Sequence, residues 1–331
     1  MYHPRFKGTP YDAGLQFGKL LRKSGGTVAE GFPFTDERQR FARQSLPIYQ
    51  QIYPEVVEEI QGVADGLGGR FEELITFLFS MYCFTLDVAC SCFAISDGKN
   101  IIFGRNSDFM VAIEKYYKST FYKLNNTYAF IGNTTGFIEM EDGINERGLA
   151  AGLTFIYPVK TKAGINAGMM VRYILEKCST VREAVDFVKS IPIASQNTLT
   201  LTDSTGDIAV VECNCEQVEV TQPTGERQYV AITNDFKSEA MQKYRYHGED
   251  DIFSGVRYAT LQKALCEQTC YSIDFAMELL SGKHGFLCQY DRKQGFDTVW
   301  SSVYDLKKGK IYRAEGNPSR KQFKEDVRLF I

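Results

Sequence analysis

A thiol, a guanidinium and a carboxylate occur together in one short segment of the sequence. Residues 89–109 read Ala-Cys-Ser-Cys-Phe-Ala-Ile-Ser-Asp-Gly-Lys-Asn-Ile-Ile-Phe-Gly-Arg-Asn-Ser-Asp-Phe, with an Asp-Gly pair at 97–98 between two apolar runs. An Asp-Gly pair between β-like runs is typical of a hairpin turn. Folding about this turn would bring Cys90 beside the stretch that carries Arg105 and Asp108. We therefore expect these three side chains in one small site.

The chemistry open to such a site is attack by the thiol on an acyl carbon. A thiol attacks an amide only as the thiolate, and its reference pKa of about 8.5 leaves it mostly protonated at neutral pH. Arg105 could stabilise the thiolate by its charge. A cut between Ala89 and Cys90 would free an α-amine with a pKa of about 7.7 to 8.0, which could accept the thiol proton within the same residue. This mechanism needs no histidine, and the chain has only His3, His247 and His284.

Each of these features also has an interpretation without chemistry. Cys90 could be a small buried residue at the start of a strand, because free cysteine is often buried. The Gly-Arg-Asn-Ser-Asp-Phe run at 104–109 could be a strand that ends in a polar turn. Cys92 would point to the same side of a strand as Cys90 and is the rival nucleophile. His247 and His284 lack a matching cysteine motif, which argues against a papain-like cysteine–histidine pair.

The elements that must position these residues change in character near residue 90. Before it the patterns are helical, at 11–21, after a cap at 34–37, at 54–64 and from 71 towards 82. After it β-like runs predominate, at 91–95, 101–105, 119–124, 127–132, 136–140, 149–155, 198–202, 208–213, 218–221, 298–305 and 310–314. Helical patterns interrupt them at 168–177, 180–190, 255–266 and 272–281. Strand blocks alternating with helix pairs predict an α+β architecture of packed sheets with helices outside.

Composition argues against several classes of protein. The chain has 331 residues, of which 44% are hydrophobic, and these are ample for a sizeable core. Its 38 basic and 41 acidic residues give a formal charge of -3 and are mixed along the chain, so we expect no nucleic-acid partner and no membrane partner. No secretion signal and no run of about 20 apolar residues is evident, so a cytoplasmic location is expected. Nine cysteines without CxxC spacing argue against a disulfide framework and a zinc site.

Four separated motifs resemble one group of enzymes. They are Cys-Ser-x-Phe-Ala-Ile from Cys90, Phe-Gly-Arg-Asn-x-Asp-Phe at 103–109, Asp-Gly-Ile-Asn-Glu-Arg-Gly-Leu-Ala at 142–150 and Ile-Thr-Asn-Asp-Phe at 232–236. In this order they resemble the choloylglycine hydrolase and penicillin V acylase family of N-terminal-nucleophile hydrolases. The long leader before Cys90, with Glu-Ile-Gln-Gly-Val-Ala-Asp-Gly at 59–66, is more similar to the related acyl-coenzyme A:6-aminopenicillanic acid acyltransferase family. The resemblance covers nearly the whole chain.

The resemblance implies a role for each matching residue. Cys90 matches the nucleophile, which autocatalytic cleavage of the bond after Ala89 exposes. Arg105 matches an arginine near the sulfur, and Asp108 matches a carboxylate that orients the new amine. Asn234 matches a side chain that donates to the tetrahedral oxyanion.

Two further matches compete with structural interpretations. Asn145 matches a second contributor to the oxyanion site, but the Asp-Gly-x-Asn sequence at 142–145 is also a common turn. Arg257, in the sequence Ser-Gly-Val-Arg-Tyr, matches an arginine that organises the site in choloylglycine hydrolases. It could equally be a solvated helix residue in a surface ion pair.

The resemblance also implies a fold and a reaction. The fold is a four-layer αββα sandwich, with a helical leader over 1–89 that would become a small chain and a catalytic domain over 90–331. The reaction is attack by Cys90 on a linear amide or thioester, formation of an acyl-enzyme, and release of the acyl group to water or to an amine. No metal or organic cofactor is needed, and acyl-coenzyme A could serve as the acyl donor. Related enzymes are often homo-oligomers or cleaved heterodimers.

Two alternatives to this function stay open at this point. A non-catalytic member could keep the fold and bind a small ligand, with Cys92 crowding the site in place of a smaller residue. An uncut cysteine amidase could use Asp108 or another side chain as its base. The 89 residues before Cys90 also make a bile-acid substrate less expected, because choloylglycine hydrolases usually start almost at the nucleophile. Hydrolysis and acyl transfer share every residue named, so the sequence does not choose between them.

Overall fold

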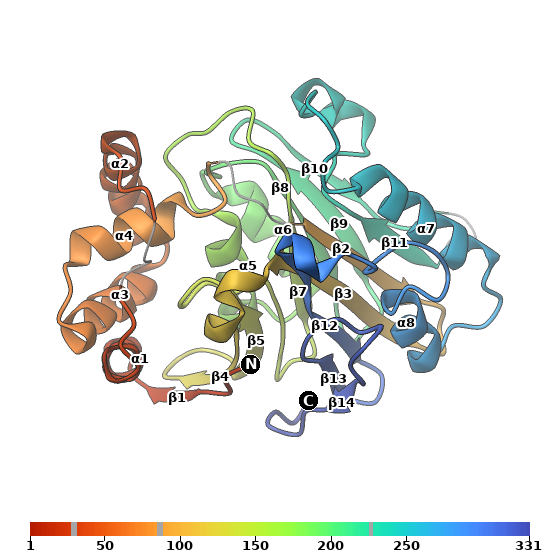
Figure 1. Cartoon of the computed structure of the whole chain (residues 1–331), viewed down its shortest axis with the longest axis horizontal. Coiled ribbons are helices and arrows are strands. Elements are labelled where there is room, and N and C mark those ends of the chain that lie inside the picture. The colour runs from red at the N-terminus through yellow and green to blue at the C-terminus, as the bar shows by residue number, and fades with distance from the viewer. Residues whose placement is uncertain (28–31, 85–88, 225–227) are drawn as a thin grey trace.

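Two antiparallel sheets form the centre of the molecule, and the larger has eight strands in the order β1-β4-β5-β6-β7-β8-β9-β10 (Figure 1). The computed structural model describes residues 1–27, 32–84, 89–224 and 228–331. The strands of the larger sheet are β1 (Arg5–Gly8), β4 (Lys118–Leu124), β5 (Phe130–Thr134), β6 (Asp142–Asn145), β7 (Ala150–Phe155), β8 (Asn197–Thr202), β9 (Ile208–Cys213) and β10 (Val218–Thr221). Among the strands of the described ranges, β1 alone runs parallel to its neighbour, which is β4.

The smaller sheet has six strands in the order β11-β2-β3-β12-β13-β14 and carries the predicted hairpin at its centre. Its strands are β2 (Ala89–Ser96), β3 (Ile101–Met110), β11 (Tyr229–Ile232), β12 (Phe296–Asp305), β13 (Lys310–Ala314) and β14 (Lys324–Glu325). Gly98 has a φ of 81° in the turn between β2 and β3, a conformation that favours glycine. The Asp-Gly pair therefore sets the turn that the sequence predicts.

Alternate residues of the central hairpin face different layers of the structure. Cys92 and Ala94 pack in a cluster with residues of the larger sheet, whereas Phe93 and Ile95 pack in a cluster with the helices of the C-terminal half. This follows from the two-residue period of a strand. The inner face of β2 therefore lies between the sheets and its outer face lies under helices.

Helices cover the outer face of each sheet. Helices α5 (Ala167–Lys177) and α6 (Val181–Ser190) contact strands of the larger sheet, and α7 (Ser254–Glu267) and α8 (Ile273–Leu280) contact strands of the smaller one. The order of layers is helix, sheet, sheet, helix (Figure 1). The prediction of an α+β, four-layer αββα fold is confirmed.

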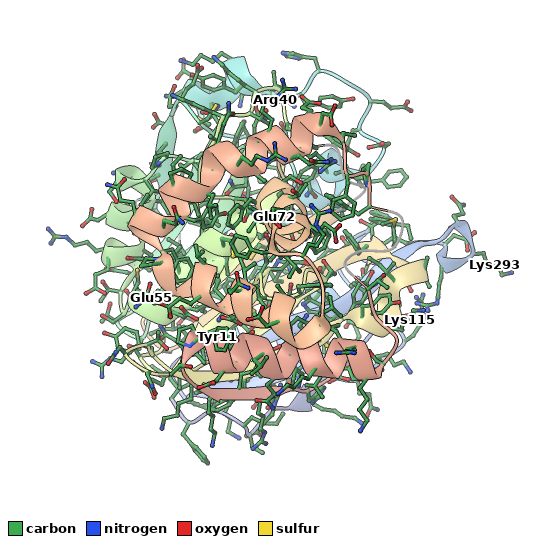
Figure 2. All side chains as sticks on the ribbon, turned by 90° about the vertical axis from the view of Figure 1, so that its left-hand side faces the viewer. Tyr11, Arg40, Glu55, Glu72, Lys115 and Lys293 are labelled. Carbon is green, nitrogen blue, oxygen red and sulfur yellow. The ribbon has the colours of Figure 1, made fainter. Side chains whose placement is uncertain are left out.

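The leader forms four helices that lie together at one side of the molecule, on the left of Figure 1 and facing the viewer in Figure 2. They are α1 (Pro10–Lys23), α2 (Asp36–Ile52), α3 (Pro54–Leu67) and α4 (Phe71–Ser80). The side chains of Thr9 and Thr35 cap α1 and α2, and Pro54 opens α3 at a position that needs no N–H donor. No helix within the described ranges is both long and apolar enough to cross a bilayer.

Several elements differ from the sequence-based expectation. The leader is not wholly helical, because β1 extends the larger sheet. Residues 136–140 form turns and irregular backbone instead of a strand, and Asp142–Asn145, for which a turn was one interpretation, form strand β6. Strand β11 was not expected, and neither were three short 3₁₀ segments. These segments are η1 (Val111–Tyr116), η2 (Glu239–Tyr244) and η3 (Arg292–Gln294).

Candidate active site

The β2–β3 hairpin determines which side of the sheet each candidate residue occupies. Cys90 pairs with Ser107, Cys92 with Arg105, and Ala89 with Asp108. Residues directly opposite each other on neighbouring strands share a face. Cys90 and Arg105 therefore point between the sheets, and Asp108 points to the outer, helix-covered face. The predicted site is assembled, but from two faces of one hairpin.

On the inner face, the Cys90 sulfur lies against a buried guanidinium. Arg105 Nη2 donates to Cys90 Sγ at 3.0 Å and to Glu141 Oε2 at 3.2 Å, while Nη1 donates to Asp142 Oδ2 at 2.9 Å. Both carboxylates are fully buried, as are Arg105 and Cys90. The two carboxylates hold the guanidinium in place, so its position beside the sulfur does not depend on the thiolate being present.

The Cys90 thiol is strongly biased towards its protonated form in the uncut chain. Burial raises the pKa of the thiol to about 12, because the thiolate would lie in a dry environment. Arg105 lowers this pKa, whereas Glu141 and Asp108 add to the rise. A nearby base is therefore needed before this thiol can act as a nucleophile at neutral pH.

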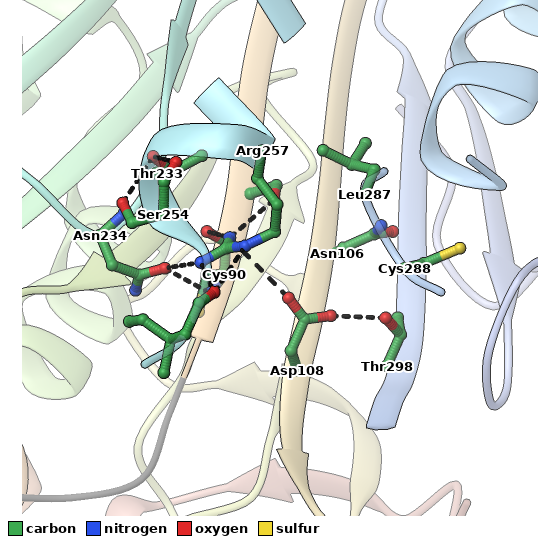
Figure 3. A network of polar contacts seen from close by, with 12 residues as sticks. Cys90, Asn106, Asp108, Thr233, Asn234, Ser254, Arg257, Leu287, Cys288 and Thr298 are labelled. Atoms are coloured by element: carbon green, nitrogen blue, oxygen red, sulfur yellow. Dashed lines mark hydrogen bonds and ion pairs between the residues drawn. The ribbon is translucent and has the colours of Figure 1, made fainter. Parts of the chain in front are cut away.

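The backbone of Cys90 is held at both ends by side chains from distant parts of the chain (Figure 3). The Cys90 amide donates to Asn234 Oδ1 at 3.0 Å, and Arg257 Nη1 donates to the Cys90 carbonyl at 2.6 Å. Arg257 Nη2 also donates to Asn234 Oδ1 at 2.6 Å. The backbone N–H of Asn234 donates to the Ser254 hydroxyl oxygen at 3.0 Å. The turn after β11, which carries Asn234, and the first turn of α7, which carries Arg257, thus both contact Cys90.

Asn234 has both polar atoms of its side-chain amide engaged. Its Nδ2 donates to the carbonyl of Phe155 at 2.7 Å, at the end of β7. Arg257 is also fully engaged, since it donates to Ser91 Oγ and to the carbonyl of Ile252. The interpretation of Arg257 as a solvated helix residue is wrong, because its side chain is completely buried.

On the outer face, Asp108 accepts hydrogen bonds from two hydroxyl groups. Thr298 Oγ1 lies 2.5 Å from Oδ1, and Tyr290 OH lies 3.1 Å from Oδ2. Arg257 Nη1 lies 3.9 Å from Oδ2 (Figure 3). Burial raises the pKa of Asp108 to about 6, against the opposing effects of Arg257, Thr298 and Tyr290. This carboxyl group can therefore change its protonation near neutral pH.

Asn145 does not join this network. Its Nδ2 donates to the carbonyls of Leu175 and Cys178 at the end of α5, and its Oδ1 accepts the amides of Arg147 and Leu149. These four bonds use the side chain to tie the β6–β7 turn to a helix end. The position of Asn145 does not support the oxyanion role implied for it. Its side-chain amide already donates to the end of α5, and Asn145 lies at the opposite end of β6 from Asp142.

The acidic pair Glu141 and Asp142 was not predicted to belong to the site. Asp142 accepts hydrogen bonds from Trp300 Nε1 at 2.9 Å and from Tyr304 OH at 2.6 Å, in addition to its pair with Arg105. Glu141 accepts from Ser107 Oγ at 2.8 Å. Two adjacent acidic residues before the Gly-x-Asn sequence could have indicated a functional site, because β-branched or apolar residues are more usual in a buried strand.

Cys92 and Tyr82 lie near the same site. Cys92 is fully buried in the layer between the sheets, and burial raises the pKa of its thiol to about 12. Tyr82 is buried in the same hydrophobic cluster as Cys90, and its hydroxyl has no hydrogen-bond partner among the described residues. A cavity of about 490 Å³ between the leader and η1 is lined in part by Tyr82 and Phe109. This cavity therefore reaches the neighbourhood of the hairpin.

The described residues hold no cluster of three or more His, Cys, Asp and Glu side chains that could bind a metal ion. The polar groups around Cys90 are two guanidinium groups, carboxylates, an amide and hydroxyls, joined in one group around Arg105 and another around Arg257. Such an arrangement can stabilise a thiolate, position an amine and donate to an oxyanion.

Solved structures and one family model are similar to this chain. A conjugated bile acid hydrolase mutant from Clostridium perfringens aligns over 73% of this chain and 98% of its own, with 18% identity and a TM-score of 0.49. Penicillin V acylase from Agrobacterium tumefaciens aligns over 68% and 82%, with 16% identity and a TM-score of 0.47. No curated protein matches the sequence. The family model described as acyl-coenzyme A:6-aminopenicillanic acid acyl-transferase matches residues 95–320, and the chain belongs to that family.

Proposed function

We propose that this protein is a self-processing cysteine enzyme that cleaves linear, non-peptide amide bonds or transfers an acyl group through a Cys90 acyl-enzyme. One observation carries the proposal: side chains hold the sulfur, the amide and the carbonyl of Cys90 separately. Arg105 contacts the sulfur, Asn234 accepts from the amide, and Arg257 donates to the carbonyl. A cysteine with only a packing role needs none of these contacts.

Cleavage before Cys90 supplies the base that the thiol lacks. The thiol adds to the carbonyl of Ala89, the amide nitrogen leaves as the α-amine of Cys90, and water hydrolyses the resulting thioester. The new amine has a reference pKa of about 7.7 to 8.0 and can accept the thiol proton. Asn234 Oδ1 already accepts from this nitrogen, and the ionised Asp108 carboxylate, on the strand opposite Ala89, is the anion that would orient it.

In the acylation step, the thiolate attacks the substrate carbonyl and the amine or thiol leaving group takes a proton. Arg105 stabilises the thiolate by charge. Asn234 Nδ2 is the proposed donor to the tetrahedral oxyanion, which requires the oxyanion to replace the Phe155 carbonyl as its acceptor. Water or an amine then releases the acyl group. No metal or organic cofactor takes part, and acyl-coenzyme A is a candidate donor through the family alone.

The acyl group has an apolar place to lie. The cavity of about 490 Å³ beside Tyr82 and Phe109 is lined largely by apolar and aromatic side chains, several of them from the leader. We propose that a small-molecule amide or thioester binds there with its hydrocarbon part against these side chains. Leader aromatics such as Phe77 would then serve both the core and the substrate.

One observation argues against the alternative of an uncut cysteine amidase. The Cys90 side chain is completely buried in the continuous chain, so a substrate carbonyl has no access to the sulfur. Its thiol also lacks an amine base while the bond after Ala89 is intact. A non-catalytic binding protein would not need the buried Arg105 and Arg257 contacts, which cost desolvation.

The experiment is intact mass measurement with N-terminal sequencing of the purified protein, beside Cys90→Ala and Cys92→Ala. The wild type and Cys92→Ala should each yield chains of residues 1–89 and 90–331, and Cys90→Ala should stay whole. Cleavage in Cys90→Ala would contradict self-processing by this thiol. A whole wild-type chain that turns over amides would instead support the uncut amidase.

Labelling of the processed protein separates an enzyme from a binding protein. A reactive acyl thioester should acylate Cys90 to one equivalent, located by peptide mapping, and a hydroxylamine wash should remove the label. A folded and processed protein whose Cys90 stays unlabelled would contradict the enzyme.

A further inference from the structure

A second cavity lies between the leader and the larger sheet, and none of its lining residues within the described ranges belongs to the Cys90 network. It adjoins the cavity of about 490 Å³, with which it shares Leu21, Lys115, Tyr116, Thr135 and Phe137. It has a volume of about 640 Å³. Its walls come from the N-terminal residues, the C-terminal half of α1, the end of η1, and the start of β4 with the segment after β5. Figure 2 shows Lys115 of η1 beside the C-terminal end of α1, and residues of both line the cavity. We call this cavity the Lys118 pocket.

Lys118 is a buried cation without an anionic partner among the described residues. It is the first residue of β4, it lines the pocket, and it is only 5% exposed. Its Nζ lies 4.4 Å from the centroid of the Phe17 ring and 5.9 Å from that of Phe137. Both rings line the pocket as well. An aromatic face attracts a cation but accepts no conventional hydrogen bonds, so the ammonium group keeps donors for a ligand.

The charged groups around Lys118 do not neutralise it. Glu59 of α3 is bound by Arg172 of α5 at 2.6 Å, and Arg172 itself disfavours a charged Lys118. Burial raises the pKa of Glu139 well above its usual value, which favours its uncharged form. Lys23 and Lys115 stand at the pocket with His3, and none of the described residues that line the pocket is acidic.

We propose that the Lys118 pocket binds amphiphilic monocarboxylates, with the carboxylate at Lys118 and the hydrocarbon against Phe17, Phe137 and the leucines of α1. The lining is chiefly apolar and supplies one buried lysine, Lys118, with two exposed ones, Lys23 and Lys115. This combination recognises an apolar body with one anionic end. A buried ammonium gains more from an anion than an exposed one does, because water screens the pair less.

Binding should be linked to proton uptake. Burial lowers the pKa of Lys118 to about 7, with Arg172 acting in the same direction and Glu59 and Glu139 opposing it. A bound carboxylate favours the charged amine and raises this pKa again. The free site therefore takes up most of a proton on binding at pH 7.5, and the affinity weakens about tenfold per pH unit well above pH 7.

The experiment measures binding of decanoate to the full chain, as purified, by isothermal titration calorimetry below the micelle concentration. Titrations in two buffers of different ionisation enthalpy give the proton uptake. Wild type should bind decanoate saturably and take up part of a proton per decanoate bound. Lys118→Met should weaken decanoate binding at least about tenfold and abolish the proton uptake. Decan-1-ol, which lacks the anion, should bind both proteins alike.

Lys123→Met is the matched control, because Lys123 lies on the same strand and is exposed. It should bind decanoate as wild type does, and Lys118→Met should show a thermal midpoint no lower than that of wild type, since the change removes a buried cation. Equal decanoate affinity in Lys118→Met and wild type would overturn the proposal. Decanoate binding to wild type without proton uptake, or no saturable binding at all, would overturn it even if Lys118→Met did not fold. These measurements involve no turnover, so their outcome does not depend on catalysis by Cys90. Because the two cavities share walls, the difference between wild type and Lys118→Met, and not decanoate binding alone, reports on the Lys118 pocket.

Discussion

Cys90 is held by two chemically different environments on the two faces of one strand. The sulfur faces a guanidinium that two carboxylates hold in place, and the amide and carbonyl face a network of Asn234, Arg257 and Asp108. The separation is useful chemically, because the group that stabilises a thiolate and the groups that would hold a new amine do not compete for the same space. Each environment can therefore be changed without removing the other.

In the processed protein, replacing Arg105 by lysine should slow the reaction of Cys90 with iodoacetamide by about tenfold or more, because the Nη2–Sγ contact is lost. The variant should also be less stable, since it disturbs a buried pair with Glu141 and Asp142. Arg172→Lys is the control, because Arg172 is equally buried between Glu59 and Glu176. It should lose comparable stability and keep the labelling rate; equal slowing in both variants would count against a direct effect of Arg105.

Asp108 should make the uncut protein less stable as the pH rises. Its pKa is raised to about 6 in the folded chain, so the folded state binds a proton that the unfolded state has already lost between about pH 4 and pH 6. The stabilising contribution of the protonated Asp108 is therefore present at acid pH and is lost as the pH rises through about 6. In a Cys90→Ala background, Asp108→Asn should gain about 2 kcal/mol more at pH 7 than at pH 4, measured by urea unfolding. A pH-independent difference between the two proteins would contradict this pKa.

At the scale of elements, the leader helices α1 and α3 approach each other closely enough to need glycine. A Cβ on Gly62 would lie 2.2 Å from the Tyr11 carbonyl oxygen, and one on Gly14 would lie 2.0 Å from the Glu59 carbonyl oxygen. The contacting atoms are backbone, which cannot swing away as a side chain can. The same glycines that weaken an isolated helix therefore allow this helix pair to form.

Gly62→Ala should destabilise the protein by about 1–3 kcal/mol, because the methyl group forces α1 and α3 apart. Gly255→Ala, in α7, is the matched control, since the nearest atom to its added Cβ is at 3.4 Å. That control should change stability by less than about 1 kcal/mol. Chemical unfolding of both variants measures the difference, and a tolerated Gly62→Ala would mean that the helices can separate without cost.

At the scale of the whole molecule, the leader is part of the core of the protein. One hydrophobic cluster contains leader residues such as Ile60 and Leu74 together with Cys90, Ile174 and Trp300. Strand β1 adds the leader to the larger sheet. Tyr53 OH donates to Glu176 at 2.5 Å, next to the Glu59–Arg172 pair, so polar groups also join α3 to α5. The division at residue 89 would cut the chain without separating its layers.

If processing occurs, the chains of residues 1–89 and 90–331 should co-elute on size exclusion in native buffer and separate only in denaturant. Glu59→Ala should lower the urea concentration that releases the small chain, because it leaves Arg172 buried without this partner, at a cost of about 3–5 kcal/mol. Glu58→Ala, at the exposed neighbouring position, should leave it unchanged. If the chain of residues 1–89 eluted alone in native buffer, the leader would not be retained by the rest of the protein.

The sequence by itself determined the local features of this protein. The Asp-Gly turn, the two-residue alternation of β2 and the capped leader helices depend on neighbouring residues, so their signals are present in short stretches of sequence. The proximity of Cys90, Arg105 and Asp108 followed from one hairpin for the same reason. The order of the four motifs was sufficient to indicate the family.

Only the tertiary structure decided how distant residues meet. Arg257 and Asn234 lie far along the chain from Cys90, and the short sequence around Arg257 would also suit an exposed helix. The packing of α7 against β2 and β11 buries the Arg257 side chain and makes it part of the site. Asn145 matched a motif, yet its amide bonds to the end of α5. The partner of a side chain depends on which elements pack against it, and that packing is a property of the whole chain rather than of a local pattern.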